Sequence, residues 1–231
     1  MTRKLALIVG VGSGLSAALA RRLSEEYRLV LAARNVDKLA ALANETGAQT
    51  LAVDARDPAS MAALFDALPR APRVAIYNPS YRVRGPIAEL DPEDVRRAIE
   101  VTAFGAFLMA RHAAKAMQAA EPLEGVRGTI LFTGASAGVK GFAQSASFAM
   151  GKFAQRGLAQ SLSRELHPKG IHVAWINIDG AIRNPGRTEP ADAPDSLLDP
   201  YAIAETYLNL INQDRSAWSS EVTLRPWVEA F

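Results

Sequence analysis

Short apolar runs alternate with longer amphipathic stretches along the whole chain. Short runs bounded by turn residues predict buried strands, and apolar residues at helical spacing predict helices. The predicted strands are Lys4–Val9, Arg28–Ala33, Gln49–Val53, Arg73–Tyr77, Gly128–Thr133, Ile171–Asn177 and Glu221–Leu224. The predicted helices are Gly14–Glu26, Val36–Glu45, Ala59–Leu68, Pro92–Ala119, Ser145–His167 and Ala202–Gln213. This alternation indicates βαβ units that build a parallel sheet.

The order of these elements predicts a single Rossmann-like domain over residues 1–231. Its class is α/β, with a doubly wound parallel sheet of about seven strands. A chain of 231 residues lies within the size range of one such domain. Residues 183–200 contain four prolines and little apolar periodicity, so we expect one long loop there; such loops are usually lids, binding loops or disordered, and we expect a substrate-binding or lid loop.

Composition narrows the classes of function. The net charge is only +2, which does not favour binding to nucleic acid or to an anionic membrane surface. The chain has no cysteine, and its three histidines lack a metal-ligand spacing, so we expect no disulfide and no metal site. No apolar run approaches the ~20 residues of a membrane span. The first residues resemble a signal peptide, but glycines interrupt the apolar run, and we expect a cytoplasmic protein.

A glycine-rich turn follows the first predicted strand. It contains Gly10, Gly12, Ser13 and Gly14, and Leu15 follows at the start of the predicted helix Gly14–Glu26. Residues without bulky side chains let the backbone approach a pyrophosphate, and the amides of the helix N-terminus attract the anion. The alternative is a tight turn that needs glycine for its own conformation. The strand-turn-helix context favours a dinucleotide site.

Arg34 ends the second predicted strand, where an NAD-binding Rossmann protein usually has an acidic residue for the ribose 2′-hydroxyl. A guanidinium at this position can bind a 2′-phosphate with two hydrogen bonds. The alternative is a solvated arginine that starts a helix. The sequence therefore predicts NADP(H) as the cofactor in preference to NAD(H).

These motifs resemble those of the short-chain dehydrogenase/reductase family over nearly the whole chain. The family's TGxxxGxG turn aligns with Val9 to Ser16, so Val9 replaces the threonine and Ser16 the last glycine. The family's Y-x-x-x-K pair falls on Phe148 and Lys152. The lysine is kept, and the catalytic tyrosine is replaced.

The resemblance places the other two catalytic positions on different residue types as well. The helix-borne asparagine of the family falls on Thr102, and its serine falls on Ala135, beside Ser136. The resemblance therefore implies a short-chain oxidoreductase with a degenerate catalytic tetrad. Its substrate is an unidentified carbonyl compound or alcohol.

The resemblance also implies further cofactor contacts. Asp54 stands where the family binds the adenine ring, and Asn78 belongs to the run that matches the family's NNAG. Gly180 and Ile182 fall in the region that faces the nicotinamide amide. In the family, the residue matching Lys152 holds the ribose hydroxyls.

Phe148 cannot move a proton, and the loss of a positioned general acid costs about 10² to 10⁴-fold in rate. The candidate replacements are Tyr81, Ser136, Ser147 and a water held by Lys152. We rank Tyr81 and the water first, because Ser147 is turned away from position 148 on a helix.

Two other functions are compatible with parts of the sequence. The first is an NADP(H)-binding module, a sensor or scaffold that keeps the cofactor cleft without turnover. The second is a hydrolase, because Gly134–Gly138 reads G-x-S-x-G around Ser136. A hydrolase also needs an acid and then a histidine after the serine; here only Glu165 precedes His167 and His172, and His172 lies inside a predicted strand.

The predicted helix Pro92–Ala119 carries several alanines that allow close helix approach. In the family this region and the following long helix pair subunits. We therefore expect a homodimer or homotetramer.

Overall fold

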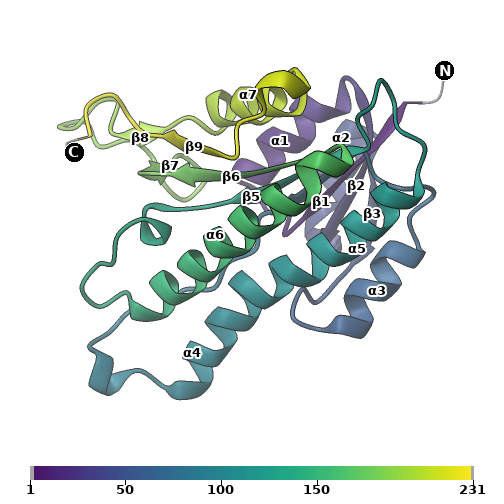
Figure 1. Ribbon diagram of the computed structural model, residues 1–231. Helices are drawn as coiled ribbons and strands as arrows, with labels where there is room; N and C mark the ends of the chain where they lie inside the picture. The colour runs from purple at the N-terminus through teal and green to yellow at the C-terminus, as the bar shows by residue number, and fades with distance from the viewer. Residues whose placement is uncertain (1–2, 230–231) are drawn as a thin grey trace.

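The computed structural model describes residues 3–229, and its centre is a seven-stranded, fully parallel sheet (Figure 1). The strand order is β3-β2-β1-β4-β5-β6-β9. The strands are β1 (Lys4–Val9), β2 (Tyr27–Ala33), β3 (Gln49–Ala52), β4 (Val74–Tyr77), β5 (Gly128–Thr133), β6 (Ile171–Ile178) and β9 (Glu221–Leu224). The predicted doubly wound α/β fold is confirmed. The outermost residues of the predicted domain 1–231 lie outside the described range.

Helices cover both faces of the sheet (Figure 1). Helices α1, α2 and α7 share one core cluster with the sheet, and α3, α5 and α6 share the other. The α-helices are α1 (Leu15–Ser24), α2 (Ala40–Thr46), α3 (Pro58–Asp66), α4 (Pro92–Ile99), α5 (Gly105–Ala119), α6 (Ala146–Leu166) and α7 (Pro200–Ile211). The 3-10 turns are Asp37–Leu39, Ile87–Glu89, Ser136–Gly138, His167–Lys169 and Arg215–Ala217.

The central strand β1 is apolar on both faces. Ala6 and Ile8 pack into the α1 cluster, and Leu5, Leu7 and Val9 pack into the opposite cluster. Side chains alternate across a strand, so a strand covered on both faces needs an unbroken apolar run. This requirement explains why short apolar runs located the strands correctly.

The predicted helix Pro92–Ala119 is divided by a π-helical turn, Glu100–Phe104, between α4 and α5. The Tyr77 hydroxyl donates a hydrogen bond to the Val101 carbonyl oxygen over 2.5 Å. A side chain inserted at a helix backbone is a known cause of such widened turns. A Cβ on Gly105 would collide with that hydroxyl. The turn therefore depends on a tertiary contact with β4.

The segment 183–200, predicted as one loop, is closed at its base. Strands β7 (Ala181–Ile182) and β8 (Leu197–Leu198) form a parallel pair, and α7 begins at Pro200. Arg183 also forms a 2.8 Å ion pair with Asp199. The residues between β7 and β8 remain a connection without a helix or longer strand.

The strand order reverses beside β1. Strand β1 pairs with β2 on one side and with β4 on the other. In doubly wound sheets, ligands bind beyond the carboxyl ends of the strands at this reversal. Within residues 3–229, no helix combines the length and the apolar character that crossing a membrane requires. The cytoplasmic location remains a prediction.

Candidate functional site

The glycine turn lies at the carboxyl end of β1. Gly10 has a φ of +83°, and a Cβ there would lie 2.5–2.7 Å from atoms of Pro79, so only glycine fits. A Cβ on Gly12 would meet nothing within 4 Å, which leaves its backbone open to a ligand. Helix α1 follows Gly14 with no side-chain cap and no acidic residue in its first turn. These features suit the binding of an anion.

Ser16, which replaces the last glycine of the family turn, ties this turn to β4. Its buried hydroxyl donates to the Gly10 carbonyl oxygen over 3.1 Å. The Asn78 amide nitrogen donates to Ser16 Oγ over 2.5 Å. The substitution is therefore accommodated by hydrogen bonds, and the predicted cofactor residue Asn78 also stabilises the turn.

A first cavity of about 880 Å³ opens between the glycine turn, the end of β2 and the end of β3. Among the predicted residues it is lined by Gly10, Gly12, Ser13, Arg34, Asp54, Asn78 and Tyr81. Arg34 is exposed there. Asp54 instead forms a 2.8 Å ion pair with Arg56. The Arg56 guanidinium is the main reason that the pKa of Asp54 lies below its usual value, and the charge of Arg34 adds to the effect.

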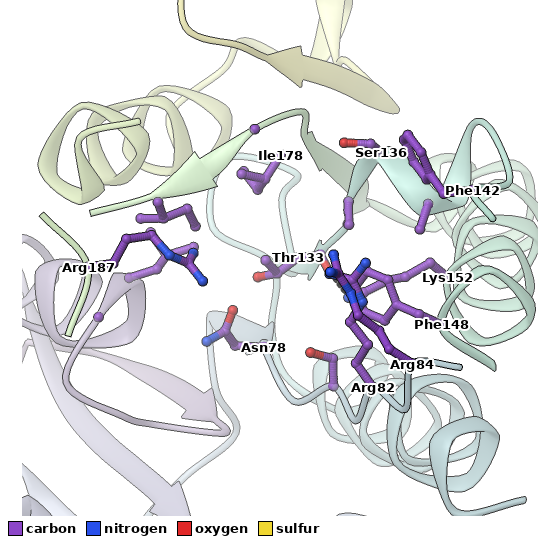
Figure 2. Close-up of a pocket in the computed structure, with 18 of the residues that line it drawn as sticks. Asn78, Arg82, Arg84, Thr133, Ser136, Phe142, Phe148, Lys152, Ile178 and Arg187 are labelled. Carbon is purple, nitrogen blue, oxygen red and sulfur yellow. Dashed lines mark hydrogen bonds between the residues drawn. The ribbon is translucent and has the colours of Figure 1, made fainter. Parts of the chain in front are cut away.

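A second cavity of about 900 Å³ lies between β5, β6 and the start of α6 (Figure 2). Among the predicted residues it is lined by Gly14, Leu15, Asn78, Ser136, Phe148, Lys152, Gly180 and Ile182. Asn78 and Ser80 line both cavities. The two cavities therefore meet at the end of β4 and can take one elongated ligand.

Lys152 is the buried cation of the second cavity. Only 2% of the residue is exposed, and its Nζ donates to the Thr133 carbonyl oxygen over 2.6 Å and to Gln155 Oε1 over 3.4 Å. Neither acceptor is a carboxylate. Because burial penalises the charged form, the pKa of Lys152 falls from 10.5 to about 7.

Gln155, which the sequence analysis did not single out, connects Lys152 to the predicted residue Thr102. Its Nε2 donates to the Thr102 carbonyl oxygen over 3.1 Å, and its Oε1 also accepts from Trp175 Nε1 over 3.3 Å. Thr102 is fully buried in the π-helical turn and is not among the lining residues of either cavity. The only sequence signal for Gln155 was its position one helical turn after Lys152.

Two candidate proton donors point elsewhere. Tyr81 lines the first cavity, away from Phe148, and its hydroxyl donates to Asp94 Oδ1 over 3.1 Å. The buried hydroxyl of Ser147 donates to the Val83 carbonyl oxygen over 2.9 Å. In the structure Tyr81 lies on the first cavity, whereas Phe148 and Lys152 lie on the second.

Ser136 lines the second cavity, and its hydroxyl forms a hydrogen bond with the Asp179 carboxylate. Burial alone would raise the pKa of Asp179, yet hydrogen bonds from Ser136 and Arg225 lower it. No histidine lines this cavity; the three histidines are His112, His167 and His172. The geometry of a hydrolase triad is therefore absent around Ser136. Among residues 3–229, no group of histidine, aspartate and glutamate is arranged to hold a metal ion.

The doubly wound sheet and the glycine turn at the β1–β4 reversal are features of Rossmann-fold dinucleotide-binding proteins. The sequence profile of the short chain dehydrogenase family matches residues 4–188. The chain therefore belongs to the short-chain dehydrogenase family, as its motifs indicated.

Known proteins of this type resemble the chain over nearly its whole length. A short-chain dehydrogenase of Rhodopseudomonas palustris is 32% identical with a TM-score of 0.81, over 97% of this chain and 99% of that one. A metagenomic short-chain oxidoreductase solved in complex with NADP is 28% identical with a TM-score of 0.83, over 99% of both chains. An uncharacterized oxidoreductase of Staphylococcus aureus is 27% identical over 98% of both chains.

The buried lysine makes stability depend on pH. Between about pH 7 and 10.5 the unfolded chain keeps a proton on Lys152 that the folded chain has released. The unfolded state then binds more protons, so this group makes the free energy of unfolding rise with pH across that window. We expect Lys152→Met to remove this rise, as measured by urea denaturation across the window.

The exposed Lys115 on α5 provides the matched control. Lys115→Met should keep the wild-type pH slope. An unchanged slope in Lys152→Met would show that Lys152 is not the titrating group.

Proposed function

We propose that this protein is an NADP(H)-dependent oxidoreductase that interconverts a carbonyl compound and an alcohol. The observation that carries the proposal is the continuous pair of cavities. The glycine turn and Arg34 lie on the first cavity, Lys152 and Phe148 lie on the second, and Asn78 lies between them. The NADP complex of the metagenomic relative supports the choice of cofactor.

The residues present fit such a cofactor. The open backbone at Gly12 and the uncapped start of α1 accept a pyrophosphate. Arg34 forms no hydrogen bond or ion pair with residues 3–229, so its guanidinium is free to bind a 2′-phosphate. Lys152 at the far end of the cleft is placed to hold the ribose beside the nicotinamide.

When bound, the cofactor supplies the hydride that reduces a carbonyl carbon, and a proton must reach the carbonyl oxygen. Phe148 cannot donate this proton, and the hydroxyls of Tyr81, Ser136 and Ser147 are directed to other partners. A water held by Lys152 supplies it in our proposal. A pKa of about 7 suits an acid that works near neutral pH.

A second candidate function is a cofactor-binding module without turnover. It is favoured by Phe148 and Ala135, which occupy the tyrosine and serine positions of the family. Both functions require the same cofactor cleft and differ only in proton transfer. If a tyrosine introduced at position 148 raises the activity, the wild-type protein lacks only an efficient proton donor. If it does not, the cavity is not suited to carbonyl reduction.

The choice of cofactor is tested by Arg34→Gln. Loss of a charge-assisted hydrogen bond should weaken NADPH binding about tenfold or more and leave NADH binding unchanged. The enhancement of nicotinamide fluorescence measures both affinities. Arg28→Gln, at an exposed position near the start of β2, the strand that Arg34 follows, is the matched control and should change neither. Equal wild-type affinity for the two cofactors would contradict the assignment.

The catalytic role of position 148 is tested by Phe148→Tyr. We expect carbonyl reductase activity on a panel of aldehydes and ketones to rise about 10²-fold, the lower part of the range for a general acid. Phe142→Tyr adds a hydroxyl to the same cavity and should give no comparable gain. If NADPH still binds and no activity appears, the non-catalytic module is the better description.

We also propose that two or four copies of the chain associate through α5 and α6. Large apolar side chains are exposed there, namely Phe104 and Phe107 around the start of α5 and Met150 and Phe153 on α6. The rings of Phe104 and Phe107 stack 6.1 Å apart. Exposed apolar patches of this kind mark interaction surfaces.

Charged replacements test this surface. Phe107→Lys combined with Phe153→Lys should dissociate the assembly to monomers, as measured by analytical ultracentrifugation. Ile87→Lys, at a side chain that is 77% exposed outside these helices, should leave the assembly intact. A wild-type monomer at micromolar concentration would refute the homo-oligomer.

A further inference from the structure

Two arginines follow β4 on the rim of the second cavity. Arg82 and Arg84 both line this cavity, and Val83 between them does not (Figure 2). Side chains two residues apart lie on the same side of an extended segment. The sequence Arg-Val-Arg therefore directs two guanidinium groups to one place.

The segment that carries these arginines is fixed to the start of α6. Arg82 Nη2 donates to Ser145 Oγ over 3.0 Å, and Ser147 Oγ donates to the Val83 carbonyl oxygen over 2.9 Å. The Gly85 amide donates to the Gln144 carbonyl oxygen over 3.2 Å. These contacts hold the two arginines beside the helix that carries Phe148 and Lys152.

The second cavity has an uncompensated positive charge. Its lining residues include four basic residues and no aspartate or glutamate; the basic residues are Arg82, Arg84, Lys152 and Arg187. Arg82 has a neutral hydrogen-bond partner and lies 5.0 Å from the centre of the Phe148 ring. Burial, and then the charge of Arg84, lower the pKa of Arg82. Like charges held this close together favour the binding of an anion.

In our proposal the phosphates of the cofactor lie at the glycine turn, away from Arg82 and Arg84. Arg187 lies toward the glycine turn, because it also lines a neighbouring cavity with Ser13 and Gly14. Figure 2 shows Arg187 across the cavity from Phe148, Arg82 and Arg84. The phosphates of a dinucleotide at the glycine turn therefore leave Arg82 and Arg84 to a second ligand.

We propose that Arg82 and Arg84 bind an anionic group of the substrate, a carboxylate or a phosphate, while its carbonyl group lies beside Lys152. This inference rests on the proposed oxidoreductase function and specifies its substrate class. Arginine binds both kinds of anion through paired hydrogen bonds. The two arginines thus set specificity and orient the substrate.

The experiment compares charged and neutral ligands that share the same reacting aldehyde, on the NADPH complex. The carboxylate pair is 4-carboxybenzaldehyde and methyl 4-formylbenzoate, and the phosphate pair is glyceraldehyde 3-phosphate and glyceraldehyde. Quenching of bound NADPH fluorescence gives each affinity, and NADPH oxidation gives each kcat/KM. We expect the charged member of at least one pair to bind about tenfold more tightly, as for a charge-assisted hydrogen bond. The pair that shows the preference identifies the anion.

Variants assign the preference to the two arginines. Arg82→Gln and Arg84→Gln should each reduce affinity for the charged ligand about tenfold and leave the neutral ligand and NADPH unaffected. Arg28→Gln removes the same charge outside the cavity and should have no effect. A wild-type protein that binds NADPH but shows no preference in either pair overturns the substrate class. Failure to bind NADPH overturns the proposed function instead.

Discussion

The reversal of strand order between β1 and β4 is the constraint on which the site depends. A parallel sheet covered by helices on both faces leaves its carboxyl edge for a ligand, and the crossovers diverge where the order reverses. Here the glycine turn packs tightly against the segment after β4, because there is no room for a side chain on Gly10 beside Pro79. A hydrogen bond from Asn78, which follows β4, to Ser16 on α1 then ties the glycine turn to the end of β4. The opening between the cavities is consequently set by the backbone of the sheet.

The buried ammonium of Lys152 is the second determinant of the site. An ion removed from water without a counter-charge is unfavourable, and neutral hydrogen-bond acceptors compensate only part of that free energy. Thr133 and Gln155 provide such acceptors, and the ring of Phe148 lies 5.9 Å from Nζ. The arrangement therefore leaves Lys152 with a pKa of about 7, so the lysine gains or loses its proton near neutral pH. A tyrosine in place of Phe148 would add a hydroxyl to this environment, so the residue at position 148 and the protonation of the lysine are physically linked.

Most of the framework could be predicted from the sequence, because buried parallel strands require unbroken apolar runs and the turn at Gly10 requires glycine. Features created by contacts between distant elements could not. The π-helical turn at Val101 depends on the Tyr77 hydroxyl, and the place of Tyr81 depends on the path of the chain after β4. Gln155 looked like any polar residue of a helix. The charge of the second cavity could not be predicted either, since a net charge of +2 does not show that four basic residues line one cavity.

The lysine of low pKa lines the same cavity as the three arginines. Arg82 and Lys152 both lie within 6 Å of the Phe148 ring centre, and burial is what lowers the pKa of Lys152. In our proposal, an anion bound by Arg82 and Arg84 brings a negative charge close to the lysine, and a nearby negative charge favours its protonated form. Binding of an anionic carbonyl compound would then favour the protonated lysine, which can supply the proton that the reduction consumes. Release of the product would favour the neutral lysine again. A neutral substrate could enter the same cavity without this coupling, so the charge of the substrate would govern proton supply as well as affinity.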